Sequence, residues 1–155
     1  MKTVIEHSCG HTHTADLLGT NSHGERDRKA EWLATQLCPD CARTQRDETH
    51  RQQAEDATRV ATENGWPALT GSEKQIAWAE QIRVDAVADM ENRLTKRLDA
   101  DVTEKALTYW TSAALRQTDA AWWIDNRLRI LPSINSLTLT ADERATLSQM
   151  TGAGK

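Results

Sequence analysis

Two short motifs decide the N-terminal fold, Cys9-Gly10-His11 and Cys38-Pro39-Asp40-Cys41. The second motif is a Cys-x-x-Cys knuckle, a tight turn that points two thiolates at one ion. The first offers a thiolate and an imidazole two residues apart, and its glycine permits the backbone to reverse. Together they contain all three cysteines of the chain and supply the set of ligands that a closed tetrahedral zinc site requires. The expected ligands of a structural Zn²⁺ ion are Cys9, His11, Cys38 and Cys41.

The histidine that acts as the fourth ligand is open at this level. His11 fits the first knuckle best, but His7, His13 and His23 are also available. Residues two positions apart lie on the same face of an extended strand, so His7 and His11 are both placed to reach the ion.

Two alternatives involve no metal: the three cysteines are reduced thiols, or Cys38 and Cys41 form a disulfide. A Cys-x-x-Cys motif in a chain without a secretion signal is usually metal-binding or redox-active. A thioredoxin-like redox site would need a βαβ frame, whereas a long polar helix is expected after Cys41. The metal site is therefore the favoured interpretation.

The composition bounds the class of protein. The chain has 155 residues, of which 38% are hydrophobic and 27% charged, which fits one ordinary domain or two small ones. No apolar run approaches the ~18 residues of a transmembrane helix, and no signal peptide is visible, so a cytoplasmic location is expected. The net charge of -4 disfavours a general nucleic-acid coat, although a local basic face is compatible with it.

The first 45 or so residues predict a small zinc-ribbon-like module. Residues 1–6 and 12–18 are expected to form two short strands, and residues 25–37 a helix that returns the chain to the metal. A module of this size buries too little apolar surface to fold unaided, so the metal is expected to supply much of its folding free energy. The module is assigned to residues 1–45.

A long polar helix is expected to follow the second knuckle, starting with Pro39 in its first turn. Over residues 42–63 charges of both signs are interleaved, and the apolar positions are mainly alanines. Such a pattern suits a solvent-exposed connecting helix. The connector is assigned to residues 46–65 and ends at Asn64-Gly65.

Residues 66–131 are expected to form a small antiparallel helical bundle. Ser72 is a candidate N-cap with Gln75 at the capping-box position. The helix that follows is expected to run for about 26 residues, with Ile82 and Leu94 buried. Its apolar stripe consists of Ile76, Ala79, Ile82, Ala86, Met90, Leu94 and Leu98.

Three further helices are expected. One starts from Asp101 or Thr103, one spans residues 120–128 with Thr118 or Asp119 as its cap, and a short one follows Thr140, with Glu143 completing a capping box. Leu131-Pro132 is expected to end the bundle. Residues 132–155 would then hold the short helix and a flexible tail from Thr151. The expected fold class is mainly α, with a small hairpin-plus-helix zinc module, a long polar helix and a small helical bundle.

Three islands of the sequence carry a resemblance. They are the Cys-Gly-His and Cys-Pro-x-Cys module at residues 9–41, the segment 69–83 containing Gly-Ser-Glu-Lys-Gln and Trp-Ala-Glu, and Trp122 to Arg127. In these islands the chain resembles uncharacterised small bacterial and phage proteins of mobile elements. The resemblance implies an architecture and a setting, that of a phage or mobile-element accessory factor. An inhibitor of a host defence system such as CRISPR is one such factor.

Trp122, Trp123 and Arg127 form the candidate contact surface. Adjacent residues on a helix point about 100° apart, so one narrow seam cannot absorb both indoles. Tryptophan and arginine are typical of protein interface hot spots, and they also stack on bases of single-stranded nucleic acid. The alternative is purely structural: both indoles pack inside the bundle.

The acidic side chains show no catalytic pairing. None of the candidate carboxylates lies near a histidine or the metal motif, and all five histidines lie at or before His50. The carboxylates considered are Asp85, Asp89, Asp99, Asp101, Asp119 and Asp125. Lys74 beside Ser72 could hold an anion at a helix start, but a plain cap and a solvated lysine explain the same residues. A closed zinc site also lacks the open position that catalysis needs, so no enzyme is expected.

The expected function is therefore non-catalytic. The chain would be a zinc-binding interaction protein that docks on a host or phage protein or nucleoprotein. The alternative is a zinc-ribbon regulator that binds nucleic acid, with Arg26, Arg28 and Lys29 contacting phosphates. The negative net charge favours the first.

Overall fold

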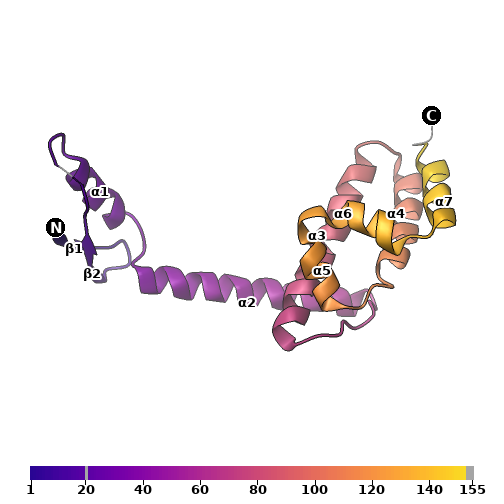
Figure 1. The fold of residues 1–155 in the computed structure, drawn as a ribbon, viewed down its shortest axis with the longest axis horizontal. Helices are drawn as coiled ribbons and strands as arrows, with labels where there is room; N and C mark the ends of the chain where they lie inside the picture. Colours follow the sequence, from indigo (N-terminus) through magenta and orange to yellow (C-terminus); the bar gives the residue numbers. More distant parts are fainter. Residues whose placement is uncertain (20, 153–155) are drawn as a thin grey trace. The chain divides into compact units, whose positions relative to one another are not determined.

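The computed structural model describes residues 1–19 and 21–152, and the chain divides into two compact units, Met1–Gln52 and Gln53–Lys155. The boundary falls inside one long helix (Figure 1). The chain is mainly helical with a two-stranded hairpin at its N-terminus, as the sequence predicts. The two units are described separately below.

The N-terminal unit begins with an antiparallel hairpin of β1 (Lys2–Glu6) and β2 (Thr12–Asp16). Side chains alternate across it, so Ile5 is buried whereas Val4 is exposed. Helix α1 (Glu25–Ala34) packs against β1. It ends earlier than predicted, because the chain turns at Gln36 and directs the carbonyl of that residue to the segment after β1.

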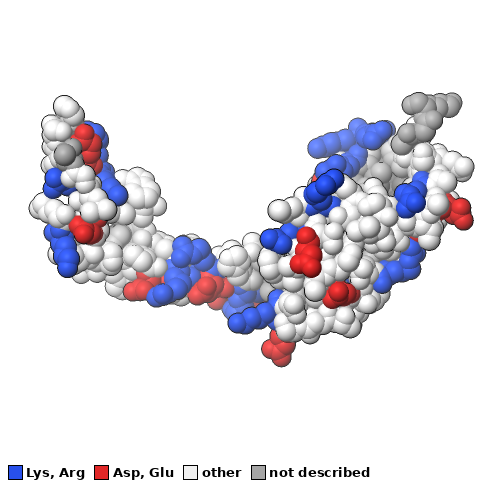
Figure 2. Space-filling model, viewed as in Figure 1, with Lys and Arg blue, Asp and Glu red and all other residues white. Residues whose placement is uncertain are grey.

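Helix α2 (Pro39–Glu63) begins with Pro39 at its first position, where a missing N–H breaks no helical bond. Charges of both signs alternate along its surface (Figure 2). Ion pairs between residues three apart support it, including Arg43 with Asp40 and Arg59 with Asp56. Residues 43–53 are exposed on every side, which agrees with the predicted polar helix.

The C-terminal unit consists of packed helices. Its main helices are α3 (Glu73–Thr95), α4 (Ala100–Ala114), α5 (Ala120–Asn126) and α7 (Ala141–Thr151). Helix α3 packs against α4 and α5, and α4 packs against α7. Between α5 and α7 lie three short turns: the 3-10 helix η1 (Arg127–Arg129), α6 (Ile130–Ser133) and the π-helical turn η2 (Ile134–Thr138).

Two indoles form the centre of this bundle. Trp110 and Trp123 are fully buried, and each ring N–H has a partner, Asn135 Oδ1 at 3.0 Å and the Gln117 carbonyl at 2.9 Å. A buried tryptophan needs such an acceptor, because an unpaired indole N–H is costly in an apolar core.

The start of α3 is joined to the start of α5 by backbone bonds. The Thr70 amide donates to the Thr118 carbonyl at 2.8 Å, and the Ala120 amide donates to the Thr70 carbonyl at 2.9 Å. Gly71 follows with φ of 150°, and a Cβ on it would lie 3.0 Å from the Ala120 Cβ. The close approach therefore requires glycine.

Both predicted capping boxes are present. Ser72 and Gln75 exchange bonds at the start of α3, and Thr140 and Glu143 do the same at the start of α7. Asp119, one of the two caps predicted for α5, accepts from the Ala121 amide.

The buried face of α3 differs from the prediction. Ile82 and Leu94 are only partly buried, whereas Arg83, which lies outside the predicted apolar stripe, is fully buried. Arg83 takes that position because two indoles and a carboxylate surround its guanidinium, as described below.

Leu131-Pro132 does not end the bundle. Pro132 lies within the first turn of α6, where its missing N–H removes no helical bond. Beyond it Ile134 and Leu139 are buried in the same core. Thr151, where the flexible tail was predicted to begin, is the last residue of α7; residues 153–155 of the predicted tail lie outside the described residues.

Candidate metal centre and contact surface

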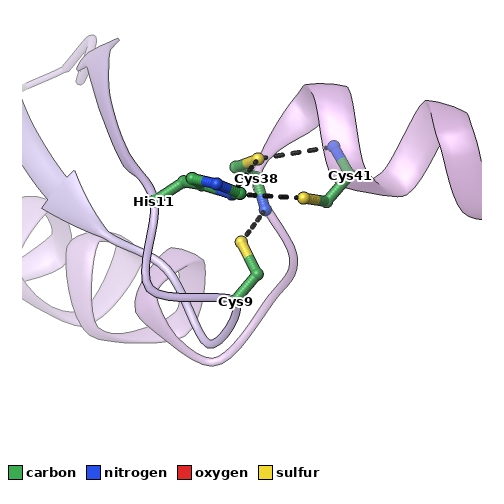
Figure 3. A group of neighbouring side chains, drawn as sticks. All are labelled: Cys9, His11, Cys38 and Cys41. Carbon is green, nitrogen blue, oxygen red and sulfur yellow. Dashed lines mark hydrogen bonds between the residues drawn. The ribbon is translucent and has the colours of Figure 1, made fainter.

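The structure brings the four predicted ligands together (Figure 3). Cys9 and His11 lie in the loop between β1 and β2, Cys38 lies directly before α2, and Cys41 lies in the first turn of that helix. Their ligand atoms all lie within 4.8 Å of one another. The His11 Nδ1 atom is 3.2 Å from Cys41 Sγ and 3.8 Å from Cys38 Sγ. Ligands around one tetrahedral Zn²⁺ lie about 3.3–3.8 Å apart, so the arrangement is compatible with a metal site.

Local backbone bonds build both knuckles. In the first, the Gly10 amide donates to the His7 carbonyl at 2.8 Å, and Gly10 has φ of 78°, a conformation that favours glycine. In the second, the Cys41 amide donates to Cys38 Sγ at 3.4 Å. The Cys38 amide donates to Cys9 Sγ at 3.3 Å and so joins the two knuckles. Amide donors directed at sulfur stabilise thiolates, which are the form that binds metal.

The hydrogen bonds and the crowding within this group shift the pKa values of two of its thiols. Hydrogen bonds from the Cys38 and His11 backbone amides lower the pKa of Cys9 to about 6. The pKa of Cys41 is raised to about 11, chiefly by its side-chain hydrogen bond with Cys38, and also by burial. Crowding of the sulfur atoms therefore opposes the charging of Cys41. A divalent cation would offset that opposition, because a coordinated thiol is deprotonated outright.

The other candidate histidines do not share this arrangement. Among the described residues, the group of side chains close enough to hold one ion contains His11 and none of His7, His13 and His23. His7 is buried, with its Nδ1 atom 3.2 Å from the Gln36 carbonyl oxygen. The His13 ring lies 6.0 Å from that of His7.

The predicted contact surface divides between core and exterior. Trp123 is fully buried, so it belongs to the bundle core, and its assignment as a contact residue is wrong. Trp122 is partly buried and meets Trp123 edge to face, with ring centroids 5.5 Å apart. The two adjacent indoles therefore differ in exposure, as their angular separation on a helix predicts.

Arg127 stacks on a tryptophan that the sequence did not associate with it. Its guanidinium lies 5.2 Å from the centroid of the Trp78 ring, and Trp78 is 49% exposed. Leu128, the next residue, is 86% exposed. We call Trp78, Arg127 and Leu128 the platform. The one signal for it in the sequence is the position of Trp78 off the apolar stripe of α3.

Arg83 forms the second arrangement that the sequence did not reveal. Its guanidinium donates to Glu80 Oε1 at 3.3 Å and to the Pro67 carbonyl at 3.0 Å, and it lies near the rings of Trp66 and Trp123. Burial raises the pKa of Glu80 and lowers the pKa of Arg83, and the attraction between the two charges opposes both shifts. Glu80 lies three residues earlier on α3, but Trp66 and Pro67 lie in the loop before that helix and Trp123 lies on α5, so helical periodicity does not reveal the group around this arginine.

The remaining candidates have plain structural explanations. The Ser72 amide donates to Gln75 Oε1 and the Gln75 amide donates to Ser72 Oγ, and Lys74 beside them is exposed. All six candidate aspartates are exposed. Asp99 accepts from the Val102 amide at the start of α4, and Asp89 pairs with Arg93.

The predicted basic patch lies on α1. Arg28 and Lys29 are exposed, and Arg26 is partly buried. The Arg28 guanidinium donates to the His23 carbonyl at 2.7 Å. Trp32, four residues after Arg28, is 59% exposed.

No protein-family model, curated protein or solved structure compared with the chain matches it. None of the helices in the described part of the chain combines the length and the apolar character needed to cross a membrane.

Proposed function

We propose that the four-residue group holds a structural Zn²⁺ ion. Three thiolates and one imidazole form a closed tetrahedral set of the kind that structural zinc sites use. Among the described residues of the N-terminal unit, the buried side chains are Ile5, His7, Leu17 and Cys38. So small a core cannot offset the entropy of ordering about fifty residues. The ion would supply the missing folding free energy by binding only the folded unit.

We further propose that the chain is a non-catalytic interaction protein that docks on another protein through the platform. The observation that carries this proposal is the stacked pair of Arg127 and Trp78, in which Trp78 is half exposed and Arg127 is followed in the chain by the highly exposed Leu128. Tryptophan and arginine side chains dominate protein interface hot spots. Neither Arg127 nor Arg129 forms an ion pair with another described residue, so both charges are free to meet an acidic partner surface.

Leu128 favours a protein over a nucleic acid as the partner. Proteins that bind single strands present aromatic rings on which bases stack. An aliphatic side chain offers no such face and gains free energy only by being buried in an apolar hollow. The partner chemistry that fits the platform is an acidic protein surface with an apolar pocket.

The alternative, a zinc-ribbon regulator that binds nucleic acid, has its own observation. On α1 the exposed Trp32 follows Arg28 and Lys29 by four and three residues, so the three lie on one side of the helix. Acidic side chains share that helix, among them Glu25 and Glu31. They weaken the attraction for phosphates, so the protein partner is preferred.

The resemblance to proteins of mobile elements suggests the biological setting. We propose a phage or mobile-element accessory factor whose partner is a host protein or nucleoprotein, with inhibition of a host defence system such as CRISPR as one form of that role. The platform suits such a role, because an inhibitor that acts by docking needs a contact surface and no reaction chemistry.

The test compares matched surface variants. The zinc-loaded chain, Trp78→Ala, the double variant Arg127→Glu with Leu128→Ala, and Trp32→Ala are each used as bait in host extract. Bound proteins are quantified by mass spectrometry. A partner that is retained by Trp32→Ala and lost by both platform variants supports the proposal. Loss with Trp32→Ala alone would contradict it.

A second measurement tests the nucleic-acid alternative. Binding to random single- and double-stranded DNA is followed by fluorescence anisotropy at several salt concentrations. Phosphate contacts release counterions, so true nucleic-acid binding weakens steeply with salt. A steep salt slope that Trp32→Ala abolishes would replace the protein-docking proposal with the alternative.

A further inference from the structure

His7 is a buried histidine of the N-terminal unit that lies outside the group of candidate metal ligands and forms a specific hydrogen bond. The residue is 5% exposed, and its Nδ1 atom lies 3.2 Å from the Gln36 carbonyl oxygen. A carbonyl oxygen only accepts hydrogen bonds, so Nδ1 carries the proton and donates it. The other ring nitrogen, Nε2, is buried without a hydrogen-bond partner.

The bond from His7 joins the two halves of the metal centre. Gln36 lies two residues before Cys38, and its carbonyl also accepts from the Ser8 amide at 3.1 Å. His7 and Ser8 directly precede Cys9. Two adjacent residues on one side of the centre therefore hold the same carbonyl on the other side.

The backbone of His7 also closes the first knuckle. Its amide donates to the His11 carbonyl at 3.0 Å, and its carbonyl accepts from the Gly10 amide at 2.8 Å. The turn that carries Cys9 and His11 is thus closed on His7, and the His7 ring connects that turn to the segment leading to Cys38. An aliphatic side chain would fill the same volume but would leave the Gln36 carbonyl with the Ser8 amide alone.

We propose that His7 is a positioning residue of the metal centre, which sets the spacing between the two knuckles through its Nδ1–H bond to Gln36. It is not one of the proposed ligands, since the described side chains close enough to hold one ion do not include it. The inference rests on the zinc site proposed above. Residues that orient metal ligands usually change metal affinity by about 10–100-fold when they are replaced.

Three substitutions at this position separate the possible roles. His7→Asn keeps an N–H donor near the place of Nδ1, His7→Gln moves the donor to the place of Nε2, and His7→Leu keeps the volume without a donor. His13→Asn is the matched control, because His13 is a neighbouring exposed histidine outside the ligand group. Each full-length variant is titrated with Co²⁺, whose visible absorption reports thiolate ligation and geometry, and zinc affinity is measured by chelator competition.

The expected zinc affinity falls by about 10–100-fold in His7→Leu and His7→Gln, and the Co²⁺ spectrum changes in both. His7→Asn and His13→Asn should stay close to the unmodified chain. A residue that only fills the core would give the opposite order, with His7→Leu the least affected. That order, or unchanged spectra in all His7 variants, overturns the inference.

The test does not depend on His7→Leu being folded. If that variant fails to fold at any metal concentration, the comparison of His7→Asn with His7→Gln still tests the positioning role, because both side chains are polar and only that of asparagine places its donor near the position of Nδ1. Should the unmodified chain bind no metal, the proposed zinc site itself fails, and the positioning role falls with it. Normal zinc binding with insensitive His7 variants removes the positioning role alone.

Discussion

Replacing Arg83 by methionine tests the main unexpected feature of the bundle. The side chain is fully buried, and its charge is balanced by Glu80 at 3.3 Å, the Pro67 carbonyl at 3.0 Å and two indole faces. Methionine keeps most of the volume and packs well against aromatic rings. Arg83→Met therefore removes the charge while leaving little cavity.

The size of the effect follows from these contacts. A hydrogen bond from a charged group contributes about 1.5–3 kcal/mol, and each indole contact contributes about 0.5–1 kcal/mol or more when it is desolvated. The larger effect is on Glu80, which stays buried without its counter-charge. Removing one partner of a buried ion pair costs about 3–5 kcal/mol of unfolding free energy. We expect a loss in that range at pH 7.

The loss should depend on pH. Burial already raises the pKa of Glu80 from its ordinary 4.5, and without Arg83 the pKa rises further. The folded variant then holds a proton that the unfolded chain releases, so its unfolding free energy falls as pH rises above about 4.5. Near pH 5 the carboxyl is neutral more often, and the difference between variant and parent becomes smaller.

The assay is urea unfolding followed by tryptophan fluorescence and circular dichroism at pH 5 and pH 7. The double variant Glu80→Leu with Arg83→Met is the control, because replacing both charges with apolar groups is often neutral or stabilising. A loss below about 1 kcal/mol in Arg83→Met, or equal losses at the two pH values, would refute the view that Glu80 depends on Arg83.

Three further predictions concern the metal, the indoles and the Arg116–Glu143 pair. The unmodified chain should bind about one Zn²⁺ ion, and Cys38→Ser should lose it and unfold the N-terminal unit alone, since that unit has few buried side chains. Elemental analysis measures the metal content and hydrogen exchange measures the unfolding; an unmodified chain without metal would contradict the prediction. Trp123→Ala should cost about 3–5 kcal/mol of unfolding free energy as a core truncation, whereas Trp78→Ala should change thermal stability little and abolish partner capture. The Arg116 guanidinium and the Thr140 amide lower the pKa of Glu143 to about 2. Glu143 therefore stabilises the fold above pH 4.5 and loses that contribution as pH falls toward 2; urea midpoints should fall less over this range in Glu143→Gln, and equal slopes would count against it.

The features predicted from sequence depend on signals within a few residues. Ser72 with Gln75 and Thr140 with Glu143 are capping boxes that three-residue spacing reveals. The hairpin and the group of thiols and imidazole follow from the knuckle motifs in the same way. In each case, the groups that form the contact are near in sequence or are drawn to the same ion.

The features that the sequence did not reveal join distant segments. Arg127 stacks on Trp78 across 49 positions of the chain, and Arg83 is surrounded by groups from the loop before α3 and from α5. Helical periodicity treats an arginine as polar and assigns it to solvent. Tertiary packing overrides that assignment when a carboxylate and indole faces replace the water around the guanidinium.

The two units differ in what stabilises them, and this difference bears on the proposed function. The C-terminal unit has an apolar core built around Trp110 and Trp123, whereas the described part of the N-terminal unit buries few side chains besides the candidate ligand Cys38. If the proposed Zn²⁺ ion is removed, the N-terminal unit is expected to unfold, while the platform residues remain on a unit whose fold does not need the ion. A partner that contacts only Trp78, Arg127 and Leu128 would bind a chelated chain, while a partner that also contacts α1 would not. In this proposal, zinc is therefore needed for a contact surface on α1 but not for the platform.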